Sequence, residues 1–191
     1  MSETELESVI GRILKLPEDE HKKLKERTAQ IAKSLGMELW QPNPGSQSAA
    51  YFSEADETGY GGEAGPGKTE LIIGLSTTCH KRSLVLRRTN KEALGLFDRY
   101  EQVIGSRDGL NASQGIWRTT DKIIEIGGCE REDDKQKRKG QARDLIAFDE
   151  VVDFTESQYT FIIQWCRSVD PKQRCRVVAT FNPPTKPSGY G

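Results

Sequence analysis

The stretch that decides the fold is residues 62–69, Gly62-Glu63-Ala64-Gly65-Pro66-Gly67-Lys68-Thr69. It fits the phosphate-binding P-loop pattern G-x-x-x-x-G-K-[ST] at every fixed position. In that pattern the glycines let the backbone wrap around a phosphate and turn its N–H groups inward. We therefore expect Lys68 to bridge the β- and γ-phosphates of a nucleotide and the Thr69 hydroxyl to bind Mg²⁺. The alternative is a Gly-rich turn with a surface lysine.

The residues on either side of this loop favour a strand before it and a helix after it. Thr58-Gly59-Tyr60-Gly61 predicts a short strand, and residues 70–79 predict a helix with Leu71, Ile72 and Leu75 on one face. The N-terminus of such a helix adds partial positive charge beside the phosphate. The predicted nucleotide-binding residues in this segment are Gly62, Glu63, Ala64, Gly65, Pro66, Gly67, Lys68, Thr69 and Glu70.

Composition excludes several classes of protein. The 191 residues are enough for one domain with a sizeable core, and the net charge of −1 requires any nucleic-acid binding to be local or weak. The four cysteines lack C-x-x-C spacing, so we expect neither a zinc site nor a disulfide framework. No apolar run approaches the ~20 residues of a membrane span, and the acidic N-terminus lacks the basic start of a signal peptide. These features predict a soluble cytoplasmic protein.

The N-terminal part predicts helices. Residues 3–16 and 17–35 carry amphipathic patterns, and Gly36 suits the end of the second helix. We expect residues 1–37 to form a helical lead-in that packs on the core or, alternatively, docks a partner. The core would then comprise residues 38–191.

A Pro/Gly-rich connector, residues 41–48, precedes the P-loop strand and contains Gln47. A side-chain amide offers a donor and an acceptor, which matches the edge of adenine. The residues alone are equally compatible with a solvent-exposed loop glutamine.

Beyond the P-loop helix, residues 83–87 predict a short buried strand of the parallel kind. Asn90 can cap a following helix over residues 91–104. The paired Arg87 and Arg88 could contact phosphate or a neighbouring subunit, or form surface salt bridges.

The remaining elements are weaker signals. Residues 105–115 predict a loop, and residues 116–126 predict a β-hairpin or two strands that end at Gly127-Gly128. Residues 130–143 predict an exposed charged loop, either solvated or in contact with nucleic acid or a neighbouring active site. A helix is expected from Thr155 or Ser157 to Trp165, and another buried strand over residues 174–180.

An apolar strand that ends in two acids supplies a second set of candidate residues, Leu145-Ile146-Ala147-Phe148-Asp149-Glu150. In P-loop ATPases we expect this strand beside the P-loop strand, with its end facing the γ-phosphate. Asp149 would hold Mg²⁺ through its water shell, and Glu150 would polarise the attacking water. Thr180 and Asn182, at the end of the last strand, could sense the γ-phosphate or could simply form an Asn-Pro turn.

Taken in order, these motifs resemble the ATPase domain of a tailed-bacteriophage terminase large subunit. The similarity runs over roughly residues 38–187, from Gln-Pro-Asn-Pro-Gly-Ser-Gln and the P-loop, through Leu-Val-Leu-Arg-Arg-Thr and Asp-Leu-Ile-Ala-Phe-Asp-Glu, to Ala-Thr-Phe-Asn-Pro-Pro. It implies an α/β P-loop NTPase fold of the additional-strand, catalytic-glutamate type, with a mostly parallel sheet flanked by helices.

The resemblance also implies a function. The family hydrolyses ATP with Mg²⁺ to move double-stranded DNA into a procapsid, in the cytoplasm of the bacterial host. It works as a ring, usually of five subunits, with the portal protein and the small terminase subunit. In this reading Gln47 contacts adenine, and Thr180 and Asn182 couple hydrolysis to movement. An arginine of the same or the adjacent subunit completes the site, with Arg88, Arg138 and Arg143 as candidates.

Three departures from the family pattern matter. Family members continue into a nuclease domain, whereas this sequence ends at Gly191, so we expect a fragment without DNA-cutting activity that could be monomeric in isolation. The P-loop strand would then lie near an exposed sheet edge, which favours lower stability or self-association. Glu63 would repel a triphosphate unless it points away, and Pro66 lacks an N–H to donate. A helicase-like ATPase and a degenerate nucleotide-binding assembly module therefore stay open as alternatives.

Overall fold

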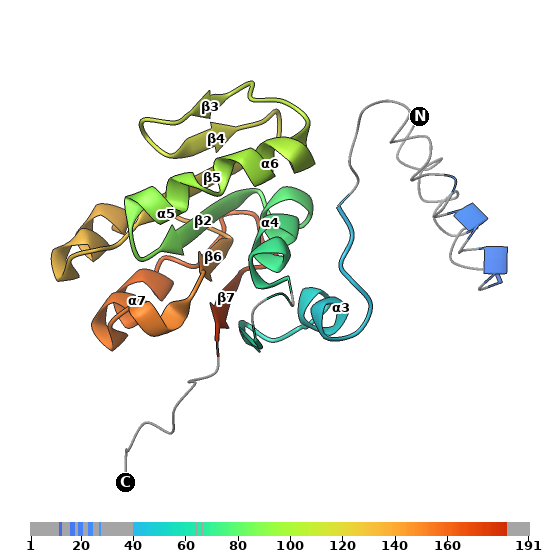
Figure 1. The fold of residues 1–191 in the computed structure, drawn as a ribbon, viewed down its shortest axis with the longest axis horizontal. Helices are drawn as coiled ribbons and strands as arrows, with labels where there is room; N and C mark the ends of the chain where they lie inside the picture. Colours follow the sequence, from blue (N-terminus) through green and yellow to red (C-terminus); the bar gives the residue numbers. More distant parts are fainter. Residues whose placement is uncertain are drawn as a thin grey trace, which may run out of the picture. The chain divides into compact units, whose positions relative to one another are not determined.

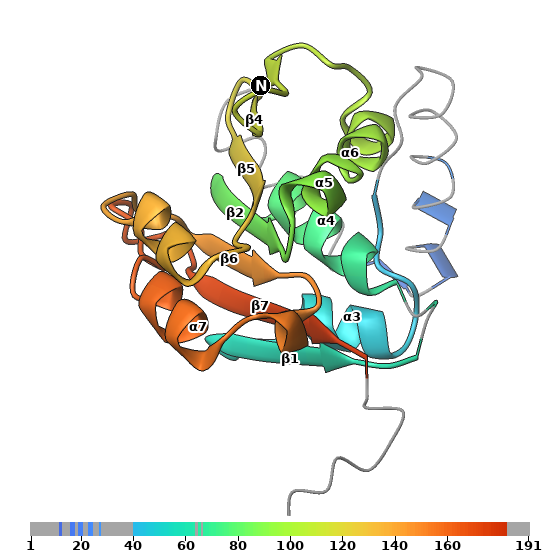
Figure 2. The ribbon, with the colours of Figure 1, turned by 60° about the vertical axis from the view of Figure 1, so that its left-hand side comes forward.

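A twisted sheet with the strand order β1-β7-β6-β2-β5-β4-β3 forms the centre of the described chain (Figures 1 and 2). The computed structural model describes residues 40–182 except 64 and 66, together with residues 12, 16, 17, 19, 20, 23, 24 and 27. The chain divides into two units, Met1–Leu39 and Trp40–Gly191, and the sheet with its helices belongs to the second. Most of the expected lead-in, residues 1–37, lies outside the described residues, as do Ala64 and Pro66.

The strands are β1 Glu57–Gly61, β2 Arg82–Arg87, β3 Leu110–Asn111, β4 Ile116–Arg118, β5 Ile123–Gly128, β6 Leu145–Phe148 and β7 Arg176–Phe181. The α-helices are α3 Ser46–Tyr51, α4 Lys68–Thr78, α5 Asn90–Leu94, α6 Phe97–Ile104 and α7 Glu156–Ile163. The unit that starts at Trp40 also contains two 3₁₀ helices, η1 Glu132–Arg138 and η2 Val151–Asp153. Strands β1, β7, β6, β2 and β5 are parallel, and β4 and β3 add an antiparallel edge. The predicted fold class, a mostly parallel sheet flanked by helices, is confirmed.

The order of the strands corrects one expectation. The strand that carries the two acids, β6, does not pair with the P-loop strand β1, because β7 lies between them. Tyr60 of β1 is in register with Thr180 of β7, and Phe148 of β6 is in register with Ala179. Strand pairing is decided by which apolar faces the helices can cover, and the local sequence does not encode it. Within the described residues β1 lies at an edge of the sheet, as expected for the P-loop strand.

Strands β2, β6 and β7 supply buried side chains to both faces of the sheet, which makes three layers. In β6, Leu145 and Ala147 pack in one buried cluster with α4 and α6, while Ile146 and Phe148 pack in another with α7. Successive strand residues point to opposite faces, so a continuous apolar run is the pattern of a strand covered on both sides. Figures 1 and 2 show α4 and α7 on opposite sides of the sheet. The buried apolar residues therefore form two clusters, one on each face of the sheet.

Several element boundaries differ from the sequence prediction. The connector at residues 41–48 contains the start of α3, and the helix expected over residues 91–104 is two helices, α5 and α6. Gly95 stands at the break, consistent with the low helix propensity of glycine. Thr89, not Asn90, caps α5 through a capping box with Glu92. The Asn90 side chain instead accepts a hydrogen bond from the Gly128 N–H at 2.8 Å.

The charged segment at residues 130–143 is more ordered than a solvated loop. It contains η1, and its last residue, Arg143, is only 1% exposed. Within the described residues, no helix has both the length and the apolar character needed to cross a bilayer.

Candidate nucleotide-binding site

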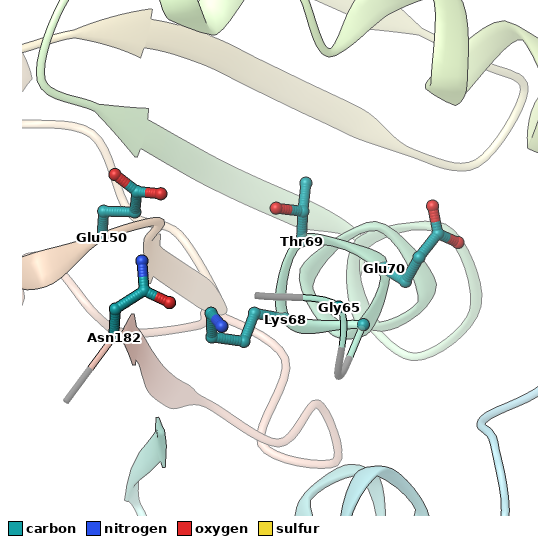
Figure 3. Close-up of a pocket in the computed structure, with 7 residues that line it drawn as sticks. Gly65, Lys68, Thr69, Glu70, Glu150 and Asn182 are labelled. Carbon is teal, nitrogen blue, oxygen red and sulfur yellow. The ribbon is translucent and has the colours of Figure 1, made fainter. Parts of the chain in front are cut away.

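A pocket of about 340 Å³ lies where the N-terminus of α4 meets the segments that follow β6 and β7. Figure 3 shows its lining, which is made by Gly65, Gly67, Lys68, Thr69, Glu70, Glu150 and Asn182. In open parallel sheets, ligands bind in the crevice outside the carboxyl ends of the strands. The sheet thus brings three predicted motifs, far apart in the sequence, to one pocket.

Gly67 is the turn that lets the loop enter the helix. It adopts the left-handed conformation, with φ 73°, and stands at the N-cap of α4. A Cβ atom here would lie 2.5 Å from the Gln47 Nε2 atom. Glycine is therefore required both for the backbone conformation and for the close approach of Gln47. Helix α4 begins at Lys68, two residues earlier than expected.

Lys68 is held inside its own loop. Its side chain donates hydrogen bonds to the carbonyl oxygens of Gly62 and Glu63, at 2.8 and 2.7 Å. The residue is only 9% exposed. These carbonyls keep the ammonium at the pocket, where phosphate oxygens can replace them as acceptors. Glu63 itself is exposed.

Asp149 is the centre of the polar network. Its carboxylate is 2% exposed and accepts hydrogen bonds from the hydroxyls of Thr69, at 2.9 Å, and Thr180, at 2.7 Å. Arg87, at the end of the adjacent strand β2, donates from Nε at 2.8 Å. One buried carboxylate therefore ties the P-loop helix to β2 and β7.

Glu150 follows in an unusual backbone conformation. Among the described residues it is the one non-glycine residue with positive φ, at 63°. Such strain costs about 1–3 kcal/mol and persists where the surroundings hold it. The holding contact is the Glu150 N–H, which donates to the Thr180 hydroxyl at 3.1 Å. Because β6 ends at Phe148, Asp149 turns inward while Glu150 lies exposed at the pocket, next to Asn182 in Figure 3.

Gln47 is hydrogen-bonded to the P-loop at Gly67. Its Oε1 accepts from the Asn43 N–H at 2.5 Å, and its Nε2 donates to the Gly67 carbonyl at 2.8 Å. The solvent-exposed alternative is wrong, because Gln47 is 2% exposed. Both halves of the amide are engaged within the chain, so in this structure Gln47 positions the P-loop.

Glu70, the last residue of the predicted loop set, turns its carboxylate away from the other lining residues (Figure 3). It accepts from Arg99 Nε at 2.6 Å and Nη2 at 2.9 Å, and from the Trp40 indole at 3.2 Å. The hydrogen bonds from Arg99 hold the pKa of Glu70 below its ordinary value. Its side chain therefore anchors α4 to α6.

The three predicted arginine candidates are engaged elsewhere in the chain. Arg143 pairs with Glu125 at 2.7 Å and lies just before β6, at the end of that strand opposite Asp149. Arg138 donates to the Gly128 carbonyl at 3.1 Å, and Arg88 donates to the Cys129 carbonyl at 3.1 Å. None of the three lines the pocket. Arg143 is buried and the Arg138 side chain is 18% exposed, so internal contacts hold both of these arginines of the segment 130–143.

Arg87 contacts the site through Asp149 but is not among the site residues predicted from the sequence. Its sequence signal is its place at the end of a strand of the same parallel kind as residues 145–148. Pairing of β2 with β6 then sets Leu86 opposite Phe148 and brings Arg87 beside Asp149. Pairing partners are tertiary information, so the sequence alone did not single it out from Arg88.

The residues present fit Mg²⁺ bound together with a nucleotide. The Thr69 hydroxyl and the Asp149 carboxylate, 2.9 Å apart, are hard oxygen donors of the type this ion prefers. Within the described chain no group of three His, Cys, Asp or Glu side chains could hold a metal ion. A P-loop site does not need such a group of three side chains, because phosphates and water supply the remaining Mg²⁺ ligands.

A scan against protein-family models finds no match, and a search of curated proteins finds none either. Solved structures do match. The ATPase domain of the large terminase of Thermus phage P74-26 has a TM-score of 0.52 at 15% identity, over 77% of this chain and 67% of that one. The large terminase of a thermophilic bacteriophage has a TM-score of 0.54 at 18% identity, over 75% of this chain and 40% of that one. An arginine-to-alanine variant of the P74-26 domain has a TM-score of 0.50 at 14% identity, over 76% of this chain and 67% of that one.

These similarities are at the level of the fold, and this chain spans less than half of the thermophilic-bacteriophage terminase. The aligned share of this chain, about three quarters, is comparable to the extent of the unit that starts at Trp40. That unit therefore has the fold of a phage large-terminase ATPase domain, a mostly parallel P-loop NTPase sheet flanked by helices.

Proposed function

We propose that this chain is the ATP-hydrolysing motor domain of a DNA-packaging terminase, which couples hydrolysis to the translocation of double-stranded DNA into a procapsid. The observation that carries the proposal is one hydrogen-bonded chain, Thr69 to Asp149 to Thr180 to the Glu150 N–H. It joins the P-loop, the acidic strand end and the last strand at a single pocket. The fold neighbours, which are large terminases by name, support the packaging role.

Each residue then has a chemical task. Lys68 binds the β- and γ-phosphates, and the N-terminus of α4 adds partial positive charge. Thr69 and Asp149 would hold Mg²⁺, which would neutralise charge on the phosphate oxygens. Glu150, exposed at the pocket, orients and polarises the attacking water. Gln47 keeps Gly67 in place rather than reading adenine, because its amide is already engaged.

Coupling would run through β7. The Thr180 hydroxyl contacts both acids, and Asn182 lines the pocket one residue beyond the strand. A change at the γ-phosphate would therefore alter contacts at the end of β7. Because β7 pairs with both β1 and β6, a shift of its end would be passed to both neighbouring strands.

We propose that the transition-state arginine comes from a neighbouring subunit, because none of Arg88, Arg138 and Arg143 lines the pocket of its own chain. This assignment fits a ring, of five subunits in the resembled family, assembled with the portal protein and the small terminase subunit in the host cytoplasm. The rate of ATP hydrolysis per subunit should then rise with protein concentration. A rate that stays constant at all concentrations would place the arginine on the same chain.

The test of the enzymatic role is Glu150→Gln, with Glu156→Gln as the matched control on the exposed first turn of α7. Loss of a general base should lower steady-state ATP hydrolysis about 10²–10⁴-fold. Binding of a fluorescent ATP analogue should stay within about threefold, since Glu150 makes no contact that forms the loop. Glu156→Gln should retain both properties.

Full hydrolysis by Glu150→Gln would remove the assigned role. If the unaltered protein binds the analogue but hydrolyses no ATP at any protein concentration, the chain is a nucleotide-binding assembly module instead of a motor.

A further inference from the structure

Arg87 lies between the two residues that are proposed to hold the metal. Its Nη2 atom is 2.6 Å from Asp149 Oδ2 and 3.3 Å from the Thr69 hydroxyl, and its Nε donates to the same Oδ2 at 2.8 Å. The Thr69 hydroxyl also donates to Oδ2, so this oxygen receives hydrogen bonds from both residues. The guanidinium thus occupies the oxygen lone pairs that a cation would need.

The burial of Asp149 explains why a cation is there. A carboxylate that is 2% exposed is unfavourable unless it is paired and hydrogen-bonded. Arg87 supplies the charge, and its own side chain is 27% exposed. Because it stands at the end of β2, at the border of the core, it can turn away without unpacking buried apolar residues.

We propose that Arg87 is the resident counter-ion of the metal-binding pair, holding Asp149 and Thr69 until Mg²⁺ displaces it from Asp149. The inference rests on the proposed function, in which Thr69 and Asp149 hold the metal. Arg87 is then a positioning residue. It keeps the empty site folded, and it sets the Mg²⁺ concentration that the site requires, because the two cations compete for one carboxylate oxygen.

The experiment measures Mg²⁺ binding without relying on turnover. Thermal unfolding is followed across a Mg²⁺ titration, once without nucleotide and once with a non-hydrolysable ATP analogue. The proteins are the unaltered chain, Arg87→Met, which keeps the apolar stem, and Arg107→Met as control. Arg107 also pairs with carboxylates, Asp98 and Glu101, but touches neither Thr69 nor Asp149.

Arg87→Met should unfold several degrees lower than the unaltered chain when Mg²⁺ is absent, because Asp149 loses its counter-ion. Mg²⁺ should recover that loss, and the Mg²⁺ concentration at half-effect should fall about tenfold, equivalent to about 1.4 kcal/mol. Arg107→Met should keep the half-effect concentration of the unaltered chain. If Arg87→Met does not fold, Arg87→Lys, which keeps the charge but loses the forked donors, should show a smaller decrease in the same direction.

An unchanged or higher half-effect concentration in the Arg87 variants overturns the inference, as does the absence of any Mg²⁺ effect on every protein. Binding of the ATP analogue at saturating Mg²⁺ separates this result from the proposed function. If the unaltered chain binds the analogue and the Arg87 variants need as much Mg²⁺, only the counter-ion role fails. If no protein binds the analogue, the proposed function fails, and the titration without nucleotide still decides the role of Arg87.

Discussion

Thr180→Val probes the contact that joins the two acids. The hydroxyl of Thr180 is fully buried, donates to Asp149 at 2.7 Å and accepts from the Glu150 N–H at 3.1 Å. Valine has almost the same shape, so the substitution removes the two hydrogen bonds and leaves no cavity. It leaves one oxygen of a buried carboxylate without its donor, and it frees the strained Glu150 turn from the contact that holds it.

The magnitude follows from these two contacts. A hydrogen bond to a charged group contributes about 1.5–3 kcal/mol, and an unsatisfied buried N–H costs about 1–3 kcal/mol. Glu150 is exposed, so water can partly replace its lost acceptor. We therefore expect the free energy of unfolding to fall by about 2–3 kcal/mol, at the low end of the sum. For a chain of this size that lowers Tm by about 4–12 °C.

The assay is urea unfolding at neutral pH, with Thr160→Val as the matched control. Thr160 is exposed on α7, and its hydroxyl bonds only within that helix, so its replacement should change stability by less than about 0.5 kcal/mol. In an Asp149→Asn background the cost of Thr180→Val should shrink by about 1 kcal/mol, because the two side chains interact directly. A Thr180→Val cost no larger than that of Thr160→Val would refute the reasoning.

Two further predictions concern the loop and a buried histidine. Gly67→Ala should weaken binding of a fluorescent ATP analogue at least about tenfold, because φ 73° is strained for alanine and its Cβ would meet Gln47; unchanged affinity would contradict this geometry. Burial lowers the pKa of His80, whose imidazole contacts Asp144 at 3.2 Å and accepts from Arg176 at 3.3 Å. Below pH ~6.5 the unfolded chain then binds a proton that the native chain does not. The free energy of unfolding should therefore be constant with respect to His80 above this pH and should fall below it, by up to about 1.4 kcal/mol per pH unit. Urea unfolding at several pH values between about 7.5 and about 5.5 checks this. His80→Gln should make the free energy of unfolding less dependent on pH over this range. The same pH dependence in both proteins would show that another group is responsible.

Sequence alone determined the parts of this protein whose chemistry is local. The spacing of Gly62, Gly67, Lys68 and Thr69 predicted the loop and the helix after it, since conformational freedom, charge and helix start are properties of neighbouring residues. The continuous apolar runs predicted buried parallel strands, and the fold class is confirmed. The end of β6 before its two acids could also be expected, because a strand that continued would turn them to opposite faces.

Tertiary structure alone decided which of these parts meet. Insertion of β7 between β1 and β6 set Thr180 against Asp149, and pairing of β2 with β6 selected Arg87 over Arg88 as the neighbour of that carboxylate. Burial turned Arg143 from a candidate finger into an internal ion pair. Side chains such as these are chosen by strand order and burial, which depend on the packing of the whole sheet. A local pattern fixes what a residue can do, whereas the packing fixes which partner it has.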